Sequence, residues 1–189
     1  MHEIYRVEKD ISGHSVIFAW EDPTQLDELS RQDMESMFIA SFLLQYRTHD
    51  VMHHAMDGEI KDYLTDYFVT FIQPRFSHDD AHYFLCARSE GKMIGFIFWE
   101  ELSDNQAYVA ELAVAPEYWR HGLGKIFMDS FSAKMPHTQK VLLITQIENK
   151  GARKFYEALG YSPSSYMHEG YSPEKYCAYE LVVNNKLLP

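Results

Sequence analysis

Residues 112–124 read Leu-Ala-Val-Ala-Pro-Glu-Tyr-Trp-Arg-His-Gly-Leu-Gly. An apolar strand at the start of this segment leads into a short turn that begins with proline. Two glycines then open an amphipathic helix. This layout directs several backbone N–H groups toward one point at the positive end of a helix dipole. The segment therefore predicts an anion site suited to a pyrophosphate.

Composition and length set the frame for the remaining chain. Its 189 residues are 46% hydrophobic and 15% aromatic, which suits one domain over residues 1–189 with a core of its own. The two cysteines, Cys86 and Cys177, lie far apart and are expected to be free thiols in a reducing cytoplasm. No leader-like segment and no apolar run near the roughly 20 residues of a membrane helix is visible. We expect a cytoplasmic protein without a membrane partner.

The net charge of −11 is concentrated in residues 21–66, which hold eleven acidic and three basic residues. Such a surface disfavours nucleic acid as a partner. It would attract a cationic substrate, such as an amine or a basic peptide. It is equally typical of a solvated helix face.

Hydrophobic periodicity predicts the order of the elements. A strand at 15–20 is followed by a helix that starts at Asp22-Pro23, and a second helix runs from about Met52 until Pro74 stops it. Further strands are expected at 82–88, 93–101, 108–115, 141–147, about 166–168 and 176–183, with helices at about 122–135 and 149–159. Strand–helix–strand units require a parallel crossover, so the order predicts an α/β (α+β) fold with a mixed sheet and helices on both faces.

Three segments in this order are familiar. They are the hairpin Tyr83–Glu101, the strand Glu111–Tyr118 leading to Gly122-Leu123-Gly124, and the helix Asn149–Tyr161. Over about 81–161 the chain resembles the GNAT superfamily of N-acetyltransferases. The resemblance implies a single-domain, mostly antiparallel sheet with a cofactor core at about 81–161 and a helical substrate-side wall at about 22–73. It also implies direct transfer of an acetyl group from acetyl-CoA to a primary amine in a ternary complex.

The resemblance also assigns the residues that bind acetyl-CoA. The motif strand of the family splays from its neighbour at a bulge, and its freed backbone binds the pantetheine arm. The residues so implied are Leu112, Ala113 and Val114 on the strand, Trp119, Arg120, His121, Gly122, Leu123, Gly124 and Lys125 at the anion site, and Asn149 and Ala152 on the next helix. Trp119 departs from the family, which usually has Arg or Gln there. Asn149 is also suited to cap its helix.

Two residues are candidates for the proton transfers. Tyr156 matches the tyrosine of the family that protonates the coenzyme A sulfur, and a phenol with a pKa of about 10 stays protonated at neutral pH. Glu111 is the one acid inside the motif strand. Glu111 is either the general base, acting directly or through water, or a residue with a structural or substrate-orienting role. Tyr108, earlier on the same strand, is a weaker candidate for the base. Tyr171 and Tyr176 are either part of an acceptor pocket or exposed loop residues.

Other readings remain open at this stage. His49, His53 and Asp57 have helical spacing that permits a metal site, but acetyl transfer requires no metal and we expect none. The chain could instead be a catalytically silent acyl-CoA-binding domain, or bind another phosphorylated ligand at Gly122–Gly124. A monomer and a homodimer are both compatible with the sequence.

Overall fold

The computed structural model describes residues 6–11, 13–49, 52, 55–74, 82–103, 105–168 and 170–183. Within these residues, eight strands form one sheet in the order β1-β2-β3-β4-β5-β6-β8-β7. β5 and β6 pair in parallel, and the other neighbouring pairs are antiparallel. The strands are β1 (Arg6–Ile11), β2 (His14–Glu21), β3 (His82–Ser89), β4 (Lys92–Ser103), β5 (Gln106–Val114), β6 (Lys140–Gln146), β7 (Ser162–Ser164) and β8 (Tyr176–Val182).

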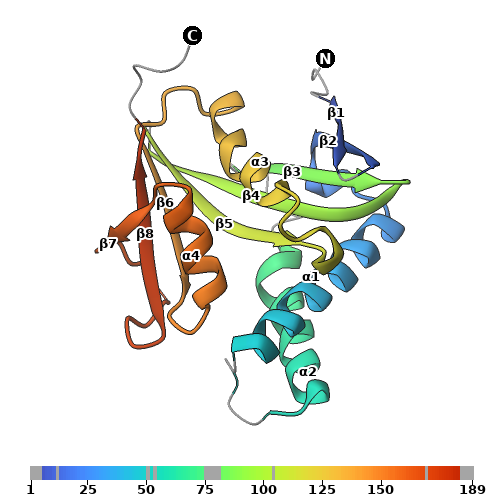
Figure 1. Ribbon diagram of the computed structural model, residues 1–189, viewed down its shortest axis with the longest axis horizontal. Coiled ribbons are helices and arrows are strands. Elements are labelled where there is room, and N and C mark those ends of the chain that lie inside the picture. The colour runs from blue at the N-terminus through green and yellow to red at the C-terminus, as the bar shows by residue number, and fades with distance from the viewer. Residues whose placement is uncertain are drawn as a thin grey trace.

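Four α-helices accompany the sheet in the described residues: α1 (Glu28–His49), α2 (Asp57–Tyr67), α3 (Leu123–Asp129) and α4 (Lys150–Ala158). A π-helical turn, Phe68–Ile72, continues α2, and a 3-10 turn, Ser130–Ala133, continues α3. Figure 1 shows α1 and α2 below the central strands, α3 above them, and α4 beside β6 and β8. The predicted class, a mixed and mostly antiparallel sheet with helices on both faces, is confirmed.

The first helix begins later than predicted. The Asp22 side chain accepts a hydrogen bond from the N–H of Thr24 at 2.9 Å, but this caps only the 3-10 turn Pro23–Gln25. Leu26 is extended, with ψ at 130°, and ends that turn. The side chain of Asp27 then accepts from the N–H of Ser30 at 2.7 Å and caps the true helix.

Two strands differ from the sequence prediction. β1 was not expected and pairs with β2 at the edge of the sheet. The strand expected around Tyr166–His168 is wrong, because β7 lies at Ser162–Ser164 instead. The Ser164 hydroxyl accepts from the N–H of Tyr166 at 3.2 Å, and this local turn leads the chain away from the sheet.

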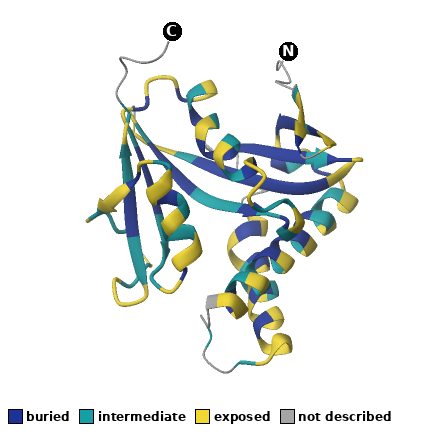
Figure 2. Cartoon of the chain, in the orientation of Figure 1, coloured by how far each residue is buried: buried dark blue, intermediate teal, exposed yellow. Residues whose placement is uncertain are grey.

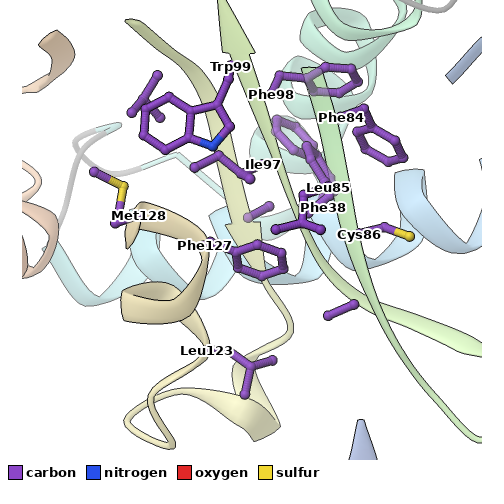
Figure 3. Packing of buried hydrophobic residues seen from close by; sticks show 14 of the residues in the cluster. Phe38, Phe84, Leu85, Cys86, Ile97, Phe98, Trp99, Leu123, Phe127 and Met128 are labelled. Atoms are coloured by element: carbon purple, nitrogen blue, oxygen red, sulfur yellow. The ribbon is translucent and has the colours of Figure 1, made fainter. Parts of the chain in front are cut away.

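The core lies on both sides of β4, which is buried without interruption from Met93 to Trp99 (Figure 2). Helices contact both faces of this strand, as a continuous apolar run requires. Figure 3 shows Phe127 of α3 directed toward the strands of the sheet. Farther along β4, the Trp99 ring meets Phe131 with centroids 5.8 Å apart, and its indole N–H donates to the Ser130 hydroxyl at 3.1 Å. No helix of the described residues is long and apolar enough to cross a membrane.

The sheet opens where β5 leaves β6. Their parallel pairing ends at Val109 opposite Leu143. On the other side of β5, Phe98 pairs with Glu111 and Trp99 with Val109, so Ala110 is an unpaired bulge residue. Beyond the bulge, β5 pairs with β4 alone while Ile144–Gln146 of β6 pairs with β8 alone. One edge of β5 is therefore free to bind something other than a strand.

Candidate functional site

A cavity of ≈ 880 Å³ lies at this opening. Its walls come from β5 and β6 on either side of the splay, from α1 and α2, from the start of α3, from α4, and from the segment before β8. The predicted substrate-side helices thus form one wall of the same cavity that the predicted cofactor motif borders. Because the cavity follows a free strand edge, residues 109–112 all line it although alternate side chains point to opposite faces.

The glycine loop, Trp119–Gly124, closes one end of the cavity. Two of its residues have left-handed backbones, Arg120 with φ at 64° and Gly122 with φ at 89°. Gly122 is followed by α3, whose first N–H groups have no partner within the helix. Gly124 has a different role, since a Cβ there would lie 2.9 Å from Cζ of Phe155. The loop therefore presents backbone donors and brings α3 close to α4.

Four cationic side chains line this end of the cavity: Arg120, Lys125, Lys150 and Lys154. Lys125 also forms an ion pair with Asp129 one turn along α3. Positive charge and unpaired N–H groups together suit a polyanionic group such as a pyrophosphate.

Trp119 joins the loop to the end of β5. Its indole N–H donates to the carbonyl oxygen of Val114 at 2.7 Å. The residue that departs from the usual family pattern is thus a hydrogen-bonded brace, and it also lines the cavity.

Tyr156 stands at the middle of the cavity wall, on α4. Asn149 caps this helix through a hydrogen bond from the N–H of Ala152 at 3.0 Å, which fixes its first turn. Tyr156 is 8% exposed, and burial together with the charge of Glu111 raises the pKa of its phenol above the ordinary value. The phenol is held in its protonated, donating form.

Glu111 lies on β5 directly after the bulge and lines the same cavity. The Tyr67 hydroxyl of α2 donates to its carboxylate at 3.5 Å. The charge of Glu111 and burial both raise the pKa of Tyr67. Glu111 therefore contacts a tyrosine of the helical wall and shares the cavity with Tyr156 of α4.

Aromatic side chains form the end of the cavity opposite the glycine loop. We call Tyr46, Tyr67, Gln146, Tyr171 and Tyr176 the tyrosine pocket; all five line the cavity. Gln146 donates through Nε2 to the Tyr46 hydroxyl at 2.8 Å, while its Oε1 is buried and has no hydrogen-bond partner among the described residues. The rings of Tyr171 and Tyr176 meet edge to face at 4.9 Å.

Most of the residues that the family resemblance implied for cofactor binding line this cavity. Leu112, Val114, Trp119, Arg120, Gly122, Gly124, Lys125, Asn149 and Ala152 line it. The side chains of Ala113 and Leu123 are buried in the core at 2% and 1% exposure, and His121 is exposed. Tyr108, the weaker base candidate, is buried and stacks on His168 outside the cavity lining.

The sequence did not identify Tyr46, Tyr67 and Gln146 as site residues. In the sequence, Tyr67 looks like one more member of an apolar helix stripe, and its only distinguishing signal is a hydroxyl. The possible metal site at His49, His53 and Asp57 lies largely outside the described residues, because these include neither His53 nor the side chain of His49. Among the residues described, no cluster of three or more His, Cys, Asp or Glu could hold a metal ion.

A family model described as "Acetyltransferase (GNAT) family" matches residues 48–161. The chain belongs to the GNAT family. The match runs from the end of α1 through α2 to just beyond α4 and thus contains the bulge, the glycine loop and Tyr156. A search of curated proteins finds no relative of this GNAT chain.

Solved structures show that the fold extends beyond the matched segment. PaiA N-acetyltransferase of Thermoplasma acidophilum, in complex with coenzyme A, aligns with a TM-score of 0.67 at 15% identity, covering 88% of this chain and 99% of that one. The ribosomal-protein-S18-alanine N-acetyltransferase of Escherichia coli aligns at 0.55 and 16% identity, covering 91% and 99%. An acetyltransferase of Thermus thermophilus aligns at 0.59 and 14% identity, covering 89% and 97%. At these identities the likeness concerns the fold alone.

Proposed function

We propose that this GNAT chain transfers an acetyl group from acetyl-CoA directly to a primary amine in a ternary complex. The observation that carries the proposal is the arrangement along one cavity. Cations and N–H donors lie at the glycine loop, a free strand edge follows, and Glu111 and Tyr156 line the same cavity. A long phosphorylated thioester fits that order of groups.

The donor occupies the cavity from the glycine loop to the bulge. Backbone N–H groups of the loop, with Arg120 and the lysines around it, bind the pyrophosphate. The backbone groups of Leu112–Val114 that remain unpaired bind the amide groups of the pantetheine arm as a strand would, while the Val114 carbonyl keeps its hydrogen bond from the Trp119 indole. The thioester then lies at the bulge, within reach of Tyr156.

The acetyl transfer itself removes protons from the acceptor nitrogen and delivers one to the coenzyme A sulfur. Glu111 accepts a proton from the ammonium of the acceptor, directly or through water. The free amine attacks the thioester carbonyl carbon, a C–N bond forms, the C–S bond breaks with its electron pair on sulfur, and the second proton of the attacking nitrogen passes to solvent. Tyr156 donates its phenolic proton to that thiolate, and exchange with solvent restores both residues. The cavity holds both reactants together, which removes the entropic cost of a bimolecular encounter.

A thiol-release assay tests this function. Acetyl-CoA is incubated with the protein and a panel of amines, and free coenzyme A is measured with a thiol reagent. Release that depends on an amine, with the acetylated amine found by mass spectrometry, supports the proposal. Tight binding of acetyl-CoA without release for any amine would show an acyl-CoA-binding domain instead.

A further inference from the structure

The acceptor end of the cavity differs in chemistry from its donor end. Of the described residues that line the cavity, the basic ones belong to the glycine loop, α3 and α4, and Glu111 is the only acidic one. The surroundings of Glu111 on the acceptor side are aromatic or uncharged. Among the described residues, this end therefore offers one carboxylate within an aromatic and otherwise uncharged wall.

The acidic stretch of residues 21–66 does not contribute to this end. No described acidic residue within 21–66 lines the cavity. Several of these carboxylates have structural partners: Asp22 and Asp27 cap turns, Glu21 pairs with Arg88, and Asp57 pairs with Arg47. A substrate carrying several positive charges would meet one described carboxylate in the cavity, and any further charge buried there would lack an ionic partner, which is costly.

Tyrosines from opposite sides of the cavity come together around Glu111. Tyr67 reaches the site from α2, and Tyr171 and Tyr176 reach it from the segment that leads into β8. Tyr46, Tyr67, Tyr171 and Tyr176 all line this one cavity, and the Tyr67 hydroxyl donates to the Glu111 carboxylate. Tyr46 of α1 adds a further tyrosine to this end of the cavity, and its hydroxyl accepts a hydrogen bond from Gln146.

Aromatic faces attract cations, and tyrosine rings also accept flat apolar groups. We propose that the acceptor is a small amine with one positive charge and an apolar, preferably aromatic, body, bound in the tyrosine pocket with its ammonium on Glu111. This assignment rests on the proposed acetyl transfer. It also accounts for release, because acetylation turns the ammonium into a neutral amide that neither Glu111 nor the rings attract as a cation.

A matched set of acceptors tests the assignment. 2-Phenylethylamine is compared with ethylamine, which lacks the ring, with L-phenylalanine, which adds a carboxylate, and with spermidine and a blocked lysine peptide, which represent polycations and protein substrates. We expect kcat/KM for 2-phenylethylamine to exceed each of the others by about 10-fold or more. Equal or better use of spermidine, ethylamine, L-phenylalanine or the lysine peptide would overturn the assignment and leave the acetyl transfer standing. Failure of every amine would instead overturn the proposed function.

Two variants of Tyr176 separate the ring from the hydroxyl. We expect Tyr176→Leu to raise KM for 2-phenylethylamine about 10-fold, while Tyr176→Phe keeps KM within about 2-fold, and both keep the Kd for acetyl-CoA. Tyr83→Phe is the control, because Tyr83 contacts Trp20 and does not line the cavity. If Tyr176→Leu leaves KM unchanged although it binds acetyl-CoA normally, the ring takes no part in acceptor binding and the assignment fails.

Discussion

The indole N–H of Trp119 donates to the carbonyl oxygen of Val114 over 2.7 Å. The bond joins the glycine loop to the last residue of β5, and both segments line the donor end of the cavity. A tryptophan at this place in the motif therefore supports the geometry of the loop by a side-chain bond, while the loop backbone remains available to a ligand.

Trp119→Phe keeps a ring but removes this donor. A hydrogen bond of this kind contributes about 0.5–1.5 kcal/mol, so we expect the Kd for acetyl-CoA, measured by isothermal titration, to rise about 2- to 10-fold. At saturating acetyl-CoA, kcat should stay within about 2-fold of wild type. An unchanged Kd would show that the brace has no effect on the loop.

Gly124 is required for the approach of α3 to α4. Gly124→Ala would place a Cβ 2.9 Å from Cζ of Phe155, and we expect it to lower the free energy of unfolding in urea by about 1–3 kcal/mol. The smaller side chain of Phe155→Leu should remove most of that cost in the double variant, because contacting residues are not additive. If Gly124→Ala lowers the free energy of unfolding equally with Phe155 and with Leu at position 155, the contact between the two residues is refuted.

Phe127 anchors α3 on the sheet. It is 0% exposed, and its ring faces Gly95 of β4, where a Cβ would lie only 2.8 Å from it. We expect Phe127→Ala to lower the free energy of unfolding by about 3–5 kcal/mol. Leu29→Ala is the control, since Leu29 is 68% exposed, and it should change stability by less than about 0.5 kcal/mol.

The pH dependence of turnover follows from the raised pKa of Tyr156. A raised pKa means that the phenol keeps its proton to a higher pH than an ordinary tyrosine, whose pKa is about 10. Turnover at saturating substrates should therefore show no loss between about pH 7 and 10 due to Tyr156. A fall in kcat centred near pH 8, absent from Tyr156→Phe, would contradict the raised pKa.

The glycine-loop half of the cavity could be predicted from the sequence because its structural signals are local. Gly122 needs a left-handed backbone, Asn149 caps the helix that it precedes, and the apolar strand before Pro116 is continuous. Each of these depends on residues within a few positions of one another. The order of strands and helices followed from the same short-range patterns.

The acceptor half depends on contacts between distant residues. Tyr46 meets Gln146 and Tyr67 meets Glu111, at separations of 100 and 44 residues. No periodicity records such pairs, so the tyrosines resembled ordinary packing residues. The polar edge strand β1 and the late start of α1 were missed for a similar reason, since pairing with β2 and the extended Leu26 decide them.

The most direct test of the proposed mechanism is the turnover of Tyr156→Phe with saturating acetyl-CoA and amine, beside Tyr83→Phe as a matched control. General acid catalysis contributes about 100-fold or more. The account predicts that kcat of Tyr156→Phe falls about 100-fold while its Kd for acetyl-CoA stays within about 2-fold, and that Tyr83→Phe turns over like wild type. Wild-type turnover in Tyr156→Phe would contradict the role of Tyr156 as the acid.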